Sequence, residues 1–205
     1  MDINEYLHDP CRSSALPYWK TVRIAIPANL SVVRDDSYSP AEYPGSDKPY
    51  FKLRHDLETP AAAPLPDGFV WTDCSLSCFA SHIRECHPDT DLTKETLTEY
   101  LTHPVYDPAL WIAAEELKSG RIVASGIAEL DTRIGEGVLE WIQVSEDYRR
   151  RGLGRCLVCE LLSRMKSRAR FVTVSGRMNS PSDPLSLYEA CGFRDRTVWH
   201  IVTKT

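Results

Sequence analysis

The fold of this chain is decided by one stretch, Val138-Leu139-Glu140-Trp141-Ile142-Gln143-Val144-Ser145-Glu146-Asp147-Tyr148-Arg149-Arg150-Arg151-Gly152-Leu153-Gly154-Arg155. Its first half predicts a strand, and leucines at helical spacing from Leu153 onward predict a long helix. Gly152 and Gly154 stand at the turn between them. A helix start leaves N–H groups unpaired and carries partial positive charge, and glycines let an anion approach closely. The stretch therefore predicts a phosphate-binding turn, to which the arginines add charge-assisted hydrogen bonds.

Two other kinds of phosphate loop do not fit the sequence. A dinucleotide-binding fingerprint needs GxGxxG, and the string from Gly152 to Leu157 has a leucine at the third glycine position. A nucleoside-triphosphate loop needs GxxxxGK[ST], and the chain contains no such string. The turn is therefore expected to bind a diphosphate of another class of ligand.

Regular patterns of apolar residues surround this turn from about residue 69 onward. Hairpins followed by an alternating section favour an α/β (mixed α+β) fold, with a mixed central sheet and helices on both faces. The strands are expected at 69–71, 110–116, 121–130, 137–144, 171–175 and 197–202, and the helices at 74–86, 92–101, 153–169 and 183–190.

The first 65 residues have a different character, because they are rich in proline and aromatic residues. They are expected to form an N-terminal extension (1–65) packed on a core domain (66–205). Short strands are predicted at 21–26, 30–34 and 50–53, and Thr59 to Pro66 reads as a linker or loop. The extension either forms one wall of an acceptor cleft or only buries surface, and the sequence leaves both open.

Composition and charge narrow the function. The 205 residues are 42% hydrophobic and carry a net charge of -5, which gives no overall bias toward nucleic acid. The segment 149–170 alone carries a net charge of +7, which favours a small anionic ligand. No secretory signal and no long apolar run is visible, so we expect a cytoplasmic protein without membrane partners. The seven cysteines, including the Cys156/Cys159 pair, are expected to be buried thiols rather than a metal site.

Two motifs carry a family resemblance. Arg149-Arg150-Arg151-Gly152-Leu153-Gly154 matches the (Q/R)xxGx(G/A) signature, and Leu187-Tyr188-Glu189-Ala190-Cys191-Gly192-Phe193 matches LYExxGF. The chain thus resembles the GCN5-related N-acetyltransferases (GNAT) over roughly residues 69–202. The resemblance implies the acyl-CoA N-acyltransferase fold with a splayed cofactor cleft. It also implies transfer of an acetyl group from acetyl-CoA to a primary amine of a small molecule or peptide by direct attack.

The resemblance also implies the residues that contact coenzyme A. Main-chain groups of the strand would line the pantetheine arm, and the Val144 N–H would face the thioester carbonyl. Asn179 would contact the arm, although its gap to Tyr188 is longer than the family usually shows. The full set implied for the cofactor is Ile142, Gln143, Val144, Arg149, Arg151, Gly152, Leu153, Gly154, Arg155 and Asn179.

Two residues are candidates for proton transfer. A lysine-like amine has a pKa of about 10.4, so a base or a water chain must take its proton at neutral pH. Glu140 is the candidate base, because period 2 puts it on the strand face of Ile142 and Val144; the alternative is a paired structural carboxylate. Tyr188 resembles the family's general acid for the departing thiolate, and the alternative is a core tyrosine. Weaker candidates for the base are Glu129 and Glu136.

The acceptor is less constrained. Acidic residues between 85 and 99 favour a cationic acceptor, or else form a solvated acidic face. His82, His87 and His103 share no metal-ligand spacing and are expected to be exposed or capping residues. A non-catalytic module that binds acyl-CoA as a sensor remains the alternative function, and a homodimer is possible.

Overall fold

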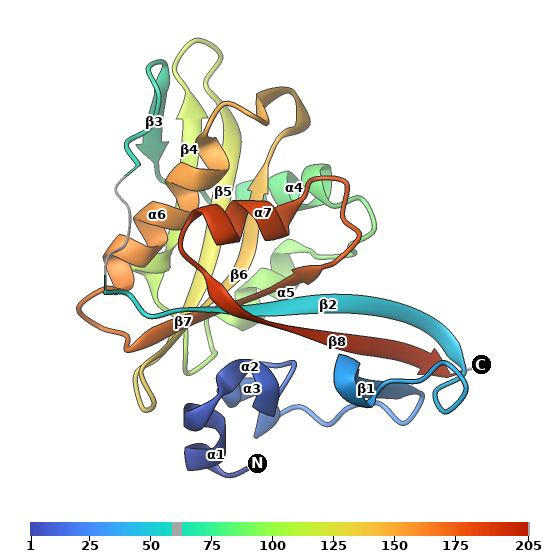
Figure 1. Cartoon of the computed structure of the whole chain (residues 1–205). Helices are drawn as coiled ribbons and strands as arrows, with labels where there is room; N and C mark the ends of the chain where they lie inside the picture. The colour runs from blue at the N-terminus through green and yellow to red at the C-terminus, as the bar shows by residue number, and fades with distance from the viewer. Residues whose placement is uncertain (59–62, 205) are drawn as a thin grey trace. The chain divides into compact units, whose positions relative to one another are not determined.

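The computed structural model describes residues 1–58 and 63–204, and these form two compact units. One unit comprises Met1–Asp56 with Phe171–Thr205, and the other comprises Leu57–Arg170. Both combine helices and strands, which confirms the predicted α/β class (Figure 1). The predicted boundary at residue 65 between an extension and a core remains a prediction. Of the predicted linker 59–66, residues 59–62 lie outside the described residues.

The unit of residues 57–170 contains an antiparallel meander of four strands in the order β6-β5-β4-β3. The predicted hairpin between β4 and β5 is confirmed, with Gly120 in the left-handed region at φ +67°. All four predicted strands are present within two residues of their expected ends. They are β3 (Phe69–Thr72), β4 (Trp111–Glu116), β5 (Arg121–Asp131) and β6 (Glu136–Val144).

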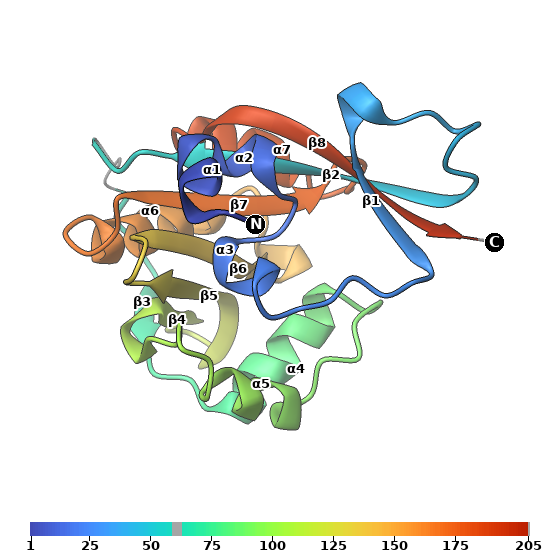
Figure 2. The ribbon, with the colours of Figure 1, turned by 90° about the horizontal axis from the view of Figure 1, so that it is seen from below.

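Helices cover both faces of this meander, as predicted (Figure 2). Helix α4 (Leu76–Cys86) packs its Phe79 and Ile83 side chains against Ile127 of β5. Helix α6 (Leu153–Met165) lies on the other face, where a Cβ on Gly126 would stand 3.1 Å from Leu161 Cδ1. Successive strand residues point to opposite faces, so neighbouring positions of β5 serve the two helices. Helix α5 (Lys94–Tyr100) packs against α4. The unit also contains two short 3-10 turns, η2 (Pro108–Leu110) and η3 (Glu146–Tyr148).

The pairing of β5 with β6 contains a register shift. Ile127 pairs with Trp141 and Ala128 pairs with Leu139, so Glu140 is the extra residue of a β-bulge. A bulge interrupts the alternation of side chains along a strand. The period-2 argument that placed Glu140 on the face of Ile142 therefore does not hold across this point.

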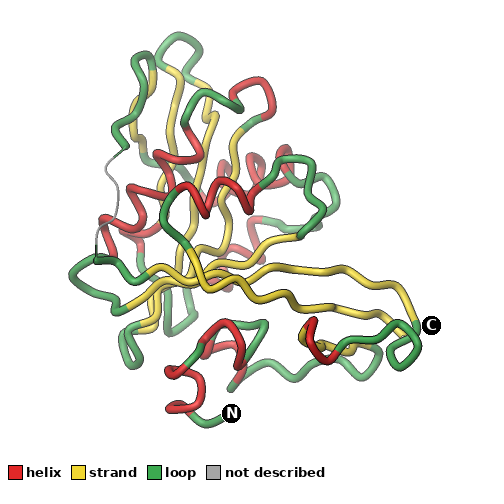
Figure 3. Tube along the Cα trace, in the orientation of Figure 1, coloured by secondary structure: helices red, strands yellow, loops and turns green. Residues whose placement is uncertain are grey.

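The unit of residues 1–56 and 171–205 contains a second antiparallel arrangement, in the order β1-β8-β2-β7. Figure 3, in the orientation of Figure 1, shows the strands of the chain in yellow. Strand β2 comes from the N-terminal segment and lies between two strands from the C-terminal segment. Helix α7 is followed by Gly192 at φ +95°, in agreement with the predicted helix end. The elements are β1 (Leu30–Arg34), β2 (Gly45–His55), β7 (Phe171–Arg177), α7 (Pro184–Ala190) and β8 (Arg194–Lys204).

The predicted strand at 21–26 is wrong. A short helix, α3 (Tyr18–Thr21), occupies its start, and the amides of Arg23 and Ile24 donate to the carbonyl of Lys20 to close a turn. Three apolar side chains of the segment stay about half exposed: Val22 at 49%, Ile24 at 48% and Ile26 at 51%. The apolar run has strand propensity, but within the described part of the chain it has no strand partner and no buried face. Packing decides strand formation more than propensity does.

A buried lysine organises the start of the chain. Lys52 of β2 is 1% exposed, and its Nζ donates to the Tyr6 hydroxyl at 3.1 Å. It also contacts the carbonyl oxygens of Pro10, Ser14 and Leu16 at 2.9, 3.0 and 2.9 Å. The Tyr6 hydroxyl belongs to α1 (Ile3–His8) and the Pro10 carbonyl to α2 (Pro10–Ser13), while Ser14 and Leu16 follow α2. The lysine therefore ties this helical segment to the strand.

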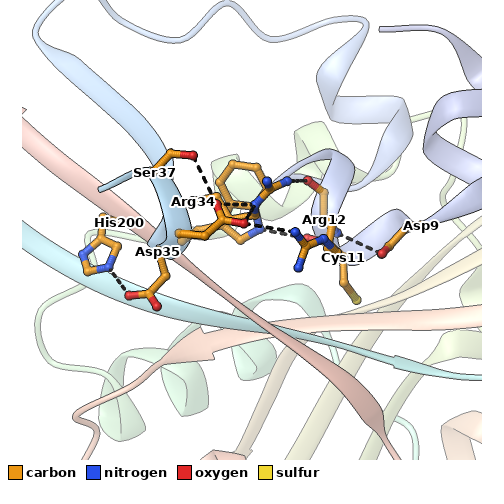
Figure 4. A network of polar contacts seen from close by, with 9 residues as sticks. Asp9, Cys11, Arg12, Arg34, Asp35, Ser37 and His200 are labelled. Atoms are coloured by element: carbon orange, nitrogen blue, oxygen red, sulfur yellow. Dashed lines mark hydrogen bonds and ion pairs between the residues drawn. The ribbon is translucent and has the colours of Figure 1, made fainter. Parts of the chain in front are cut away.

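A second polar network lies at β1 and β8 (Figure 4). His200 Nδ1 lies 2.8 Å from Asp47 Oδ2, and its Nε2 lies 3.0 Å from Asp35 Oδ1 in the turn η1 (Asp35–Ser37). Burial opposes the protonation of His200, but the two carboxylates outweigh it, so its pKa is raised. Beside it, Arg34 bonds to Asp36 and to the carbonyl of Arg12.

Candidate phosphate-binding turn

The turn from β6 into α6 is built to expose main-chain N–H groups. After η3 the chain is extended at Arg149, takes φ +63° at Arg150 and takes φ +86° at Gly152, the N-cap of α6. Among the described residues, no side chain caps this helix. Its first internal hydrogen bond runs from the Cys156 N–H to the Gly152 carbonyl at 3.0 Å. The N–H groups of residues 153–155 therefore precede the first bond within the helix, where an anion is stabilised.

The space beside Gly152 is open. A Cβ added there would have no heavy atom of residues 1–58 or 63–204 within 4 Å, and the residue is exposed. Leu153 is 1% exposed and anchors the first turn of the helix in the core. Because the backbone is held by Leu153 while the glycine leaves its outer face bare, the turn fits a diphosphate group.

Arginines surround this turn. Arg149 Nε donates to the Val144 carbonyl at 3.3 Å, and an Arg151 N–H donates to the Asp147 carbonyl at 3.1 Å. The Arg151 guanidinium also lies 4.9 Å from the centroid of the Tyr148 ring. Arg151 and Arg155 are exposed on the surface. The predicted phosphate contacts Arg149, Arg151, Gly152, Leu153, Gly154 and Arg155 thus come together at one cationic helix start.

The direction of the main-chain groups of β6 follows from its pairing. The Ser145 N–H donates to the Val123 carbonyl at 2.9 Å, so residues 123 and 145 are a hydrogen-bonded pair. In an antiparallel ladder such pairs alternate with non-bonded ones. The main-chain groups of Ile142 and Val144 therefore point away from β5, and those of Gln143 point toward it. Of these three predicted residues, only Ile142 and Val144 direct N–H groups to the side of β6 opposite β5.

The candidate carboxylates differ in their surroundings. Glu140 is half-buried at the bulge. Glu129 is 3% exposed, with its Oε1 3.7 Å from His103 Nδ1, and Glu136 is fully buried. The greater exposure of Glu140 suits a group that must exchange protons with a substrate, so it stays the preferred candidate.

Tyr188 and Asn179 belong to the other unit. The Tyr188 ring is 6% exposed and packs against Phe51 and Phe193, with centroids 6.1 and 5.6 Å apart. Burial raises its pKa far above the usual tyrosine range, so the hydroxyl keeps its proton even at alkaline pH. Asn179 is exposed in the turn that follows β7.

The prediction that His82 is exposed or capping is wrong. His82 is 3% exposed, with Nδ1 2.8 Å from Ser125 Oγ and Nε2 3.1 Å from Ser145 Oγ. It lies three residues after Phe79 and four before Cys86, and this spacing on the inner face of α4 is the signal that could have revealed it. His87 is exposed, as expected, and His103 is 27% exposed beside Glu129.

The cysteines partly follow the prediction. Cys156 and Cys159 are buried, and the Cys156 thiol donates to the Pro64 carbonyl at 3.2 Å. Cys86 is half-buried, and burial, followed by the negative charge of Glu85, raises the pKa of its thiol to about 11. A thiol with such a pKa is not an activated nucleophile.

The acidic residues expected at the acceptor side all lie exposed on or after α4 and on α5. Glu85 pairs with Arg121 at 2.8 Å, and Glu95 stands in the first turn of α5. The exposed set is Glu85, Asp89, Asp91, Glu95 and Glu99.

In the part of the chain that the structure describes, no helix is both long and apolar enough to cross a bilayer.

Comparison with protein-family models gives a match over part of the chain. Residues 107–195 match the family model of the acetyltransferase (GNAT) domain. Both motifs singled out above fall within these residues. No significant match was found among curated proteins.

Solved structures share the fold. The chain is similar to a GCN5-related N-acetyltransferase from Sphaerobacter thermophilus, with a TM-score of 0.67 and 22% identity over 87% of this chain. It is also similar to a GNAT-family acetyltransferase from Colwellia psychrerythraea (TM-score 0.61, 12% identity, 85% of this chain). A third is the ribosomal-protein-S18-alanine N-acetyltransferase from Escherichia coli (TM-score 0.52, 18% identity, 67% of this chain and 95% of that one). The chain spans 64% of the Sphaerobacter protein and 65% of the Colwellia protein.

Proposed function

The chain belongs to the GCN5-related N-acetyltransferase family, whose members transfer acyl groups from acyl-coenzyme A, and on that premise we propose that it transfers an acetyl group from acetyl-CoA to a primary amine. The observation that carries the proposal is the uncapped, glycine-bearing start of α6 among arginines. The acceptor is the amine of a small molecule or a peptide.

The turn holds the pyrophosphate of the donor. The N–H groups of Gly152, Leu153, Gly154 and Arg155 supply hydrogen bonds along the helix start, where the macrodipole favours negative charge. Arg149 and Arg151 add charge-assisted bonds. Asn179 contributes a contact to the pantetheine arm. Coenzyme A supplies an activated thioester when it is bound.

Strand β6 supplies the polarising group. The Val144 N–H points away from β5 and donates to the thioester oxygen as the amine attacks. A preorganised donor of this kind contributes about 3–4 kcal/mol in acyl transfer. Ile142 offers a second main-chain position two residues earlier.

Two side chains move protons. Glu140 takes the proton of the attacking amine, directly or through water, from its half-buried place at the bulge. Tyr188 holds its proton at neutral pH, as any tyrosine does, and the burial that raises its pKa extends this range to higher pH; it donates that proton to the departing thiolate.

The acceptor carries positive charge in this proposal. The exposed carboxylates of α4, α5 and the loop between them attract cationic amines such as polyamines or lysine-containing peptides. Acidic amino acids are repelled by the same groups.

Release of free thiol from acetyl-CoA tests the function. The full chain is incubated with acetyl-CoA and a panel of polyamines, aminoglycoside-like amines, lysine peptides and acidic amino acids. We expect amine-dependent thiol release, strongest with the cationic amines. Binding of acetyl-CoA without release for any amine would contradict an enzyme and favour an acyl-CoA sensor, while release only with acidic amino acids would contradict the cationic acceptor.

A further inference from the structure

A polar cluster connects α4 with β5 and with the end of β6, and we call it the His82 cluster. Its members are His82, Glu85, Cys86, Ser125 and Ser145. Of these side chains, the proposed acetyl transfer uses only the negative charge of Glu85, one of the exposed carboxylates of the acceptor side. Its chemistry is that of metal ligands, because an imidazole, a thiol and a carboxylate meet there.

The three ligand atoms are already close. A ring nitrogen of His82, a carboxylate oxygen of Glu85 and the sulfur of Cys86 all lie within 4.8 Å of one another. Cys86 Sγ lies 3.6 Å from His82 Nε2. A tetrahedral zinc ion with usual bond lengths to sulfur and nitrogen holds those two atoms about 3.5 Å apart. The pair thus stands at the spacing of zinc ligands.

The helix fixes this spacing. His82 and Cys86 are four residues apart on α4, and Glu85 lies three residues after His82, so all three side chains share one side of the helix. Two ligands at i and i+4 on a helix form a common zinc-binding arrangement. One ion can therefore contact all three side chains from the same side of the helix.

Outer contacts hold two of the ligands. His82 Nδ1 lies 2.8 Å from Ser125 Oγ, and the tautomer with its proton on Nδ1 leaves the Nε2 lone pair for a metal. Glu85 Oε1 accepts from Arg121 and from Ser145 Oγ, both at 2.8 Å. Ser145 Oγ also lies 3.1 Å from His82 Nε2, so it marks the fourth side of the site.

We propose that His82, Glu85 and Cys86 bind one Zn²⁺ ion, with the fourth coordination position directed to Ser145. The Cys86 thiol releases its proton to solvent when the ion binds. A thiolate and a carboxylate then balance the two charges of the ion, so the ion and its three ligands are together neutral. Ser145 begins the turn that leads to Arg149, and the ion therefore joins α4 to the start of the phosphate-binding turn.

The experiment uses the full chain, freed of metal with a chelator and then titrated with Zn²⁺ against a competing chromophoric chelator. We expect one ion per chain. Titration with Co²⁺ should give visible bands of tetrahedral geometry and a thiolate-to-cobalt charge-transfer band. Neither readout depends on acetyl transfer, so the site can fail while the proposed enzyme activity stands, and the reverse.

Variants assign the ligands. Cys86→Ser should abolish the charge-transfer band and weaken Zn²⁺ binding by about 100-fold or more, and Ser125→Ala should weaken it by roughly 10–100-fold. Cys78→Ser is the matched control, because Cys78 is a half-buried cysteine on the same helix. It should keep both the affinity and the band.

Three results overturn the site. The first is an absent charge-transfer band in the wild-type protein, and the second is an equal loss of binding in Cys78→Ser and Cys86→Ser. Glu85→Gln provides a second test in case the Cys86→Ser variant does not fold. The Glu85 side chain is 44% exposed and glutamine has nearly the same shape, so this variant should fold like the wild type. Unchanged zinc affinity in folded Glu85→Gln would also contradict the three-ligand site.

Discussion

The N–H of Cys156 donates to the carbonyl of Gly152 at 3.0 Å, and this is the first hydrogen bond within α6. The N–H groups of residues 153–155 come before that bond and have no side-chain cap among the described residues. These N–H groups and the arginines around them are the physical basis for placing a pyrophosphate at this turn.

Replacing Gly152 should weaken the binding of coenzyme A. Gly152→Ala puts a methyl group into the open space beside the turn and strains a backbone at φ +86°, at a cost of about 1–2 kcal/mol. Gly152→Asp adds a negative charge facing a diphosphate, so we expect roughly tenfold weaker binding for alanine and a greater loss for aspartate. Isothermal titration calorimetry with coenzyme A measures both.

The matched control for this strain is Gly120→Ala. Gly120 has φ +67° in the β4–β5 hairpin and similarly open surroundings, so the variant carries the same kind of backbone penalty. It should bind coenzyme A like the wild type. Equal losses in the two variants would show that strain, and not the phosphate site, causes the effect.

Replacing Tyr188 by phenylalanine should lower kcat by about 10²–10⁴-fold, because the thiolate would leave without a proton donor. The ring keeps its packing against Phe51 and Phe193, so the melting temperature should change little. Steady-state kinetics and thermal unfolding check the two statements. Unchanged kcat would assign Tyr188 to the core alone.

The raised pKa of Tyr188 adds a pH dependence. A general acid works while it is protonated, so its contribution should persist through the pH range in which an ordinary tyrosine, with a pKa of about 10, loses its proton. The kcat–pH profile should therefore show no decline from this group at or below that value. A decline near neutral pH that Tyr188→Phe removes would contradict the assignment.

His200 should make the stability of the protein fall as pH rises. Its pKa is raised in the folded state above the unfolded value of about 6.5, because Asp35 and Asp47 stabilise the imidazolium. This contribution is complete below the unfolded pKa and is lost as pH increases through the folded one. Urea unfolding across that range should show the decrease.

His200→Gln should flatten this part of the stability profile, since glutamine keeps polar contacts but does not titrate. Replacing the exposed His8 in the same way is the control and should leave the profile unchanged. Two results would contradict a stabilising role of the network. One is a wild-type stability that rises between about pH 6 and 8, the range around and above the reference pKa of histidine, and the other is a fall that persists in His200→Gln.

Lys52→Met should destabilise the protein by about 2 kcal/mol or more. Methionine fills similar space but leaves the carbonyls of Pro10, Ser14 and Leu16 without the buried donor. Lys48→Met, at an exposed position of the same strand, should cost little. Thermal and urea unfolding of both variants make the comparison, and equal stabilities would show that Lys52 is not a structural tie.

Local patterns predicted most of the elements from residue 69 onward, because their apolar periodicity agrees with the packing that they achieve. Strand β2 was predicted only at 50–53, since its first residues are polar and include Pro49. Pro49 is tolerated because β7 begins to pair only at Tyr50, while β8 pairs along the whole polar half. That pairing joins residues about 150 positions apart in the sequence, which no local pattern reveals.

The candidate site was predictable to a similar degree. The glycines and arginines of the turn can be read directly from the sequence, because glycines and cationic residues at a helix start favour phosphate binding. The bulge at Glu140 and the burial of His82 depend on how β5 pairs and how α4 packs. Side-chain direction at both positions is set by these contacts, so the period-2 and exposure arguments did not apply there.

Titration of coenzyme A into the full chain tests the central claim most directly. Calorimetry should show saturable heat for one ligand per chain, with an affinity that falls as salt is added, because arginines and helix-start amides bind the pyrophosphate. The absence of any heat from folded protein would contradict the assignment of the β6–α6 turn as the phosphate-binding site.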